Sequence, residues 1–186
     1  MSVKKGQFFL LGAFFLVLMF YIGISVFYAP SYTTQGIGED VSNLFKNIEN
    51  EYPRAFNFGL NASSPVQTLV DFTGFADSMA SGKGVSMRAL WVVTENAGGD
   101  VNVTVGNFMG YDSDFILNVS GSINTLNVEN GKTGSSLFSS PPNEFELRLN
   151  FNTTEKNLLL EKRKSNLYLI LEMGKGFEKI AGEMKA

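Results

Sequence analysis

The spacing of polar and apolar residues changes along the chain, and each spacing predicts a different kind of element. Residues 8–28 are uncharged and mostly apolar. Between residues 41 and 52, apolar side chains recur every three or four positions, as on one face of an α-helix. From residue 85 onward, apolar and polar residues alternate, as in half-buried strands. The pattern therefore predicts an α+β chain in which helices precede strands.

Two amphipathic helices are predicted within residues 39–84. Pro53 is expected to stop the first, whose apolar face comprises Val41, Leu44, Phe45, Ile48 and Tyr52. The second is predicted to begin at Ser64 and Pro65, a capping residue followed by a proline suited to the first helical turn. It should end at the glycine-rich segment 81–84.

Strands are predicted through most of residues 85–186. The first two flank a turn at 95–100, so we expect them to form a hairpin. The seven predicted strands are 85–93, 101–106, 114–120, 122–129, 144–151, 157–162 and 166–173. They suggest an antiparallel β-sandwich of the immunoglobulin-like type. A final amphipathic helix with Phe177, Ile180, Ala181 and Met184 is expected to cover a sheet edge.

The uncharged run at 8–28 is long enough to span a membrane, since a helix of this length measures roughly 30 Å. Lys4 and Lys5 precede it, which places the N-terminus in the cytoplasm and the remainder outside the cell membrane. The predicted organisation is a basic flank with a transmembrane helix at 1–28 and a linker at 29–38. Helices follow at 39–84 and the sandwich with its terminal helix at 85–186.

The residues around the basic flank carry a second signal. Lys4, Lys5, Gly6 and Gln7 stand in that order immediately before the apolar run. This arrangement resembles the class III signal sequence of archaeal type IV pilins. The resemblance implies cleavage after Gly6 by a prepilin-type peptidase, leaving a helix that starts at Gln7. Many such pilins have serine and glutamate at the third and fifth mature positions, where this chain has Phe9 and Leu11.

The amino-acid composition limits the kinds of catalytic and metal-binding site that the chain can form. The chain has no cysteine and no histidine, which removes thiolate nucleophiles, disulfides and the usual general base and zinc ligand. We therefore expect no enzyme activity, no cofactor and no metal site. Without Lys4 and Lys5, 13 of the 15 basic residues remain against 18 acidic ones, so a nucleic-acid partner is not expected.

Four Asn-x-Ser/Thr sequons make the chain a candidate glycoprotein, with acceptor residues Asn61, Asn102, Asn118 and Asn152. The turn residues Asp100, Asp112 and Asp114 carry carboxylates of the kind that bind calcium. Acidic turn residues also bond to their own backbone, and no complete calcium-loop motif is present.

Two functions remain open. In the first, the chain is a pilin-like subunit, cleaved after Gly6, whose residues 7–28 contact copies of itself in a surface filament. In the second, it is an uncleaved single-span protein of the cell membrane whose outer sandwich binds an envelope, surface-layer or protein partner. Membrane lipid is a partner in both.

Overall fold

The computed structural model describes residues 38–186, which contain two helices and nine strands. They are α2 (Glu39–Asn61), α3 (Pro65–Ser81), β1 (Ser86–Ala97), β2 (Asp100–Phe108), β3 (Ser113–Val119), β4 (Ser122–Val128), β5 (Lys132–Phe138), β6 (Glu144–Phe151), β7 (Thr154–Glu161), β8 (Asn166–Lys175) and β9 (Glu178–Lys185). Neither of these helices combines the length and the apolar character needed to cross a bilayer. The apolar run at 8–28 lies outside the described residues.

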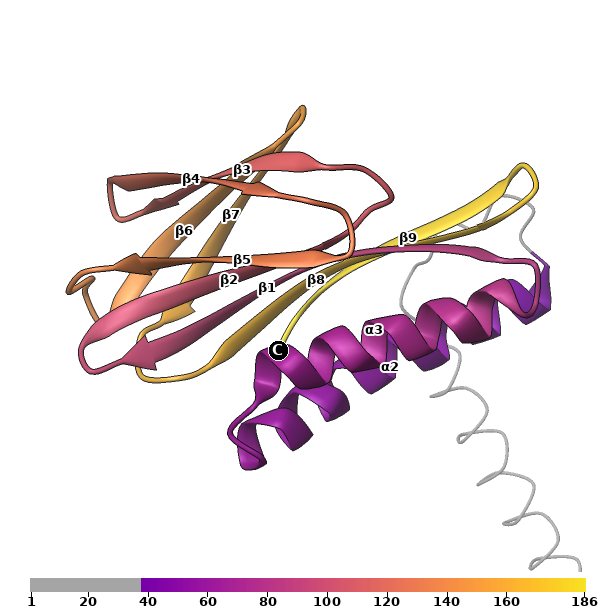
Figure 1. Ribbon diagram of the computed structural model, residues 1–186, viewed down its shortest axis with the longest axis horizontal. Coiled ribbons are helices and arrows are strands. Elements are labelled where there is room, and N and C mark those ends of the chain that lie inside the picture. The colour runs from indigo at the N-terminus through magenta and orange to yellow at the C-terminus, as the bar shows by residue number, and fades with distance from the viewer. Residues whose placement is uncertain (1–37) are drawn as a thin grey trace, which may run out of the picture. The chain divides into compact units, whose positions relative to one another are not determined.

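The strands form two antiparallel sheets. One has five strands in the order β5-β2-β1-β8-β9, and the other has four in the order β4-β3-β6-β7. The helices pack on one face of the five-stranded sheet, and the four-stranded sheet packs on its other face (Figure 1). The α+β class and the antiparallel sheets predicted from the sequence are thus confirmed, with the five-stranded sheet as the middle of three layers.

The two central strands of the middle layer are buried on both faces. In β1, Ala89, Trp91 and Val93 face the helices, whereas Leu90 and Val92 face the other sheet. Strand β8 repeats this pattern, with Leu169 toward the helices and Ile170 toward the sandwich core. Successive side chains of a strand point to opposite faces, so one apolar run supplies both cores.

A buried hydroxyl group links the helices to the sheet. Thr73 of α3 accepts hydrogen bonds from the hydroxyl of Tyr52 in α2, at 3.2 Å, and from the indole nitrogen of Trp91 in β1, at 3.3 Å. Thr73 in turn donates to the carbonyl of Leu69 at 2.7 Å. Burial raises the pKa of the Tyr52 hydroxyl well above its ordinary value. That group therefore remains a proton donor to Thr73 in alkaline as well as neutral solution.

The second predicted helix is confirmed within a residue at each end, but the end of the first was predicted wrongly. Pro53 lies inside α2, which continues to Asn61. A proline removes one backbone hydrogen bond from a helix interior. Tyr52 and Phe56, on either side of it, are both buried in the core, and this packing keeps the helix continuous.

The predicted C-terminal helix is a strand. Residues Glu178–Lys185 form β9, which pairs with β8 from Lys175↔Glu178 to Tyr168↔Lys185. Gly182 lies against α2, where an added Cβ would be 2.8 Å from the Phe45 ring. A spacing of four, as between Ile180 and Met184, places residues on one side of a helix and on one face of a strand alike. Phe177 and Ala181, which completed the helical pattern, are exposed, so only the pair compatible with both periods faces the core.

Strand β5 was not predicted at all. Its sequence contains Lys132, Gly134 and two serines, residues with little intrinsic preference for strands. Pairing with β2, from Asn107↔Lys132 to Val101↔Phe138, produces the strand in spite of its composition. The predicted hairpin between the first two strands is confirmed, with Gly98 and Gly99 at positive φ in its turn.

Replacing Gly106 by alanine tests how closely β2 approaches Trp91. A Cβ at position 106 would overlap the indole ring, so we expect Gly106→Ala to lower the free energy of unfolding by about 1–3 kcal/mol. Urea denaturation followed by circular dichroism measures the change.

Gly74→Ala is the matched control, because nothing lies within 4 Å of its added Cβ. Alanine there should raise stability by about 0.5–1 kcal/mol. Equal effects at the two glycines would contradict the packing described.

Candidate functional site

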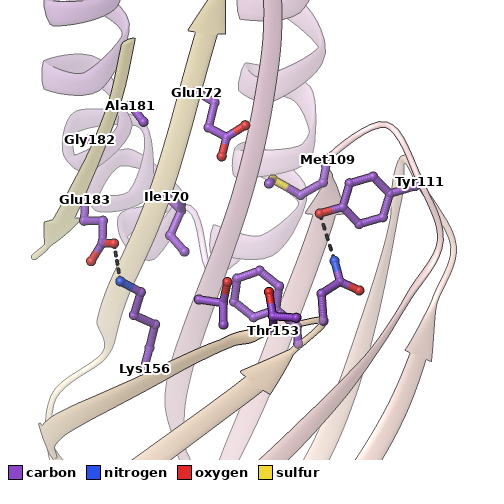
Figure 2. A pocket seen from close by; sticks show the side chains of 12 residues that line it. Met109, Tyr111, Thr153, Lys156, Ile170, Glu172, Ala181, Gly182 and Glu183 are labelled. Atoms are coloured by element: carbon purple, nitrogen blue, oxygen red, sulfur yellow. Dashed lines mark hydrogen bonds and ion pairs between the residues drawn. The ribbon is translucent and has the colours of Figure 1, made fainter. Parts of the chain in front are cut away.

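A groove with a volume of ≈ 520 Å³ lies where an edge of one sheet meets an edge of the other. Strand β7 is the last strand of the four-stranded sheet and β9 is the last strand of the five-stranded sheet. The groove is lined by Met109, Tyr111, Phe151, Asn152, Thr153, Thr154, Lys156, Ile170, Glu172, Ala181, Gly182 and Glu183 (Figure 2). We refer to it as the seam groove.

One side of the seam groove is closed by charged side chains that connect the two sheets. Lys156 of β7 pairs with Glu183 of β9 (Figure 2). The other carboxylate oxygen of Glu183 accepts a hydrogen bond from the Tyr168 hydroxyl at 3.1 Å. Lys185 donates to the carbonyl oxygen of Leu159 in β7. Side chains thus join β7 and β9, which are not neighbours in either sheet.

The opposite side is formed by Tyr111 and the β6–β7 turn. The side-chain amide of Asn152 donates to the Tyr111 hydroxyl at 3.0 Å (Figure 2). Tyr111 belongs to the connection between β2 and β3, which is organised by the buried Asn107. The amide of Asn107 donates to the carbonyl oxygens of Tyr111 and Val128, both at 2.8 Å, and its oxygen accepts from the Met109 backbone at 3.2 Å.

The seam groove combines an apolar floor with a polar rim. Met109 and Ile170 are buried, whereas Tyr111, Asn152 and Thr153 are exposed. Such a surface can hold a ligand through hydrogen bonds to the amide and hydroxyl groups and contact with the tyrosine ring. Sequence reasoning selected Asn152 only as a glycosylation acceptor and missed the other rim residues. Tyr111 lies in the β2–β3 connection, whereas Asn152 and Thr153 lie in the β6–β7 turn, so no local motif unites them.

The aspartates considered as calcium ligands bond to nearby backbone and amide groups. Asp100 accepts from the backbone nitrogen of Ser140 at 2.9 Å, and Asp112 accepts from that of Asn130 at 2.8 Å. Asp114 accepts from the side-chain amide of Asn127 at 2.7 Å. No cluster of three or more acidic side chains suited to a metal ion is found in residues 38–186. These carboxylates stabilise turns and strand pairing.

The four sequon asparagines lie in different environments. Asn61, at the end of α2, and Asn152, in the β6–β7 turn, are exposed. Asn102 is half-buried, and its sequon partner Thr104 is buried and hydrogen-bonded to Ser135. Asn118 is half-buried at the end of β3, where its side-chain oxygen accepts from the Gly121 backbone at 2.8 Å. The structure does not bring these four residues together.

Gly6 and Gln7, the residues selected for processing, lie outside the described residues. No protein-family model matches the sequence, and no curated protein is significantly similar to it. Functional interpretation therefore depends on the residues themselves.

The Glu183 carboxylate should influence the ionisation of Tyr168. Burial, followed by the charge of Glu183 and the hydrogen bond to it, raises the pKa of Tyr168 well above its ordinary value of 10.0. We expect Glu183→Gln to lower this pKa, because the charge is lost, while burial keeps it above 10.0. Titration followed by NMR of ¹³C-labelled tyrosine measures the pKa of Tyr168.

Glu172→Gln is the control. It also changes a groove carboxylate, but one that is not bonded to Tyr168, and should leave the pKa of Tyr168 unchanged. A pKa unaffected by Glu183→Gln would contradict the assigned contact.

Glycans should be attached mainly at the sequons whose residues are exposed to solvent. In a host that glycosylates exported chains, we expect glycan on Asn61 and Asn152 and little on Asn102, whose Thr104 hydroxyl is buried and bonded. Intact mass should fall by one glycan in each of Asn61→Gln and Asn152→Gln, and remain unchanged in Asn102→Gln. Glycan on Asn102 alone would show that occupancy is decided before the domain folds.

Proposed function

We propose that this chain is a membrane-inserted, outward-facing cell-surface protein, processed after Gly6 as a pilin-like subunit. In this proposal residues 7–28 form the membrane helix and later the contact with other copies in a surface filament. Residues 38–186 form the displayed domain. A helix that is stable in lipid can move into a shaft of similar helices, because either setting leaves no backbone group unpaired.

The observation that carries the proposal is the order of residues at the start of the sequence. Lys4 and Lys5 are followed by Gly6, Gln7 and an uncharged run that continues to Tyr28. The basic flank favours a cytoplasmic N-terminus, and the length of the run suits a bilayer. The resemblance to class III signal sequences adds the cleavage step.

The character of the described domain is compatible with display in water. Its apolar side chains fill two cores of its own, one under the helices and one between the sheets. The outward face of the four-stranded sheet carries the polar residues Asn118, Arg148, Asn150 and Asn157, together with the exposed apolar side chains of Ile116, Ile123 and Leu159. Such a domain needs no partner to cover its core, so it can stand beside a membrane or along a filament.

The proposal includes an immunoglobulin-like arrangement for the first seven strands. Strands β1, β2 and β5 are neighbours in one sheet, and β4, β3, β6 and β7 are neighbours in the other. In immunoglobulin-like sandwiches the first, second and fifth strands of the core similarly face the third, sixth and seventh. Strands β8 and β9 then extend the first sheet on the side of β1, and the helices cover it.

A second candidate function is supported by the seam groove. If the chain remains uncleaved, it is a single-span protein whose outer domain binds an envelope or protein partner. The exposed tyrosine, amide and hydroxyl groups of the groove would contact that partner through hydrogen bonds. Substitution of Tyr111 would then impair binding without affecting the membrane segment.

Changing Gly6 distinguishes the two candidates. In native membranes and sheared surface filaments we expect a chain that begins at Gln7. Gly6→Val should leave the N-terminus uncut and remove the protein from the filament fraction, because the peptidase would meet a branched side chain at the cleaved bond. N-terminal peptide mapping and intact mass measure both results.

Gly12→Ala is the matched control, since it changes a glycine within the apolar run and leaves Lys4-Lys5-Gly6-Gln7 intact. It should be processed normally. An unsubstituted chain that keeps residues 1–6 and is found only in membranes would overturn the pilin-like proposal and favour the single-span anchor.

A further inference from the structure

Phe177 is the most exposed large apolar side chain in the described domain, with a relative exposure of 108%. It lies in the turn between β8 and β9, next to Gly176, whose φ of 63° permits the tight turn. Lys175 and Lys179 flank it and are exposed. We call residues 174–179 the β8–β9 tip. Burying a phenyl ring from water is worth about 1.5–3 kcal/mol, so a surface that covers this ring would gain about that much.

The β8–β9 tip lies where the chain enters the domain. The backbone nitrogen of Gly38, the first described residue, donates to the Glu178 carboxylate at 3.0 Å. Figure 1 shows the start of α2, the turn between α3 and β1, and the β8–β9 turn at the same end of the domain. Glu178 directly follows Phe177, so the exposed ring is close to the point where the linker joins.

Chain length limits how far this end can be from the apolar run. Nine residues, 29–37, separate Tyr28 from Gly38. Fully extended, the ten Cα–Cα steps from Tyr28 to Gly38 reach at most about 36 Å. If residues 8–28 cross the membrane as in the proposed function, the end of the domain that carries Phe177 is held near the bilayer surface.

The charges at this end suit a membrane interface. Glu39 and Asp40 lie in the first turn of α2, where the helix dipole favours carboxylates, and Glu178 bonds to Gly38 at the same helix end. These carboxylates are thus stabilised by the helix end. The lysines Lys83, Lys175 and Lys179, however, form no ion pair within residues 38–186 and can contact other groups. Aromatic rings with neighbouring lysines are typical of the boundary between lipid and water.

We propose that the β8–β9 tip is a lipid-contacting surface, with Phe177 inserted among the headgroups of the outer leaflet and Lys175 and Lys179 directed to the lipid phosphates. This inference rests on the membrane insertion of the proposed function, and on neither the cleavage nor the filament.

The test uses full-length protein in phosphatidylcholine vesicles with brominated acyl chains, which quench tryptophan. The single native tryptophan, Trp91, is fully buried, so an added one reports its own surroundings. In Phe177→Trp we expect the added emission to fall about twofold relative to unbrominated vesicles. Leu159→Trp is the matched control. Leu159 is 64% exposed and contacts Lys185, at the end of β9 opposite to Glu178, so its emission should not change.

Flotation of each variant with the vesicles separates the two proposals. Failure of the unsubstituted chain to float would overturn membrane insertion itself. Flotation without quenching of Phe177→Trp, or with equal quenching of Leu159→Trp, would overturn the lipid contact alone. An emission that responds to protein density and not to brominated lipid would assign the tip to a second copy of the chain instead.

Discussion

The Thr73 hydroxyl fixes the helical layer to the sheet. A hydroxyl offers one donor and two acceptor positions, and here the Leu69 carbonyl, the Tyr52 hydroxyl and the Trp91 indole use all three. If either helix slid or rotated over the sheet, a buried donor would lose its partner, at a cost of about 1–3 kcal/mol. Apolar packing alone tolerates small shifts of this kind. The shared hydrogen bonds therefore determine where the helices lie, and apolar burial determines how strongly they stay there.

Local sequence predicted the elements whose apolar spacing fits only one period, such as α3 and the hairpin of β1 and β2. Local sequence did not predict the elements whose structure is determined by contacts between distant residues. Strand β5 is produced by pairing with β2, α2 continues past Pro53 because its buried face extends to Phe56, and β9 has a spacing shared by helix and strand. The sequence of β1 did indicate that this strand is covered on both faces. A strand with one face in water would have polar residues at positions 90 and 92, on the face away from Trp91, but Leu90 and Val92 are apolar.

The seam groove could not be predicted from local sequence for a related reason. Tyr111, Lys156 and Glu183 lie in different connections and strands, and they come together only because β7 and β9 end the two sheets on the same side. Asn107 belongs to the same region through its bonds to the β2–β3 connection, yet in the sequence it is one asparagine among many. Residues that hold such connections in place are recognised only when their partners are known.

The pairing of β1 with β8 has a consequence for how the domain forms during synthesis. Ser86 pairs with Gly174, so the two central strands are separated by most of the domain's sequence. As the ribosome releases the chain, α2, α3 and β1 emerge first, with their apolar faces ready but without β8 beside them. Contacts between distant residues form slowly and leave such faces open meanwhile. The five-stranded sheet can be completed only when the last twenty or so residues, which include β8, have been synthesised. Truncation there would remove a central strand of the domain and not a peripheral one.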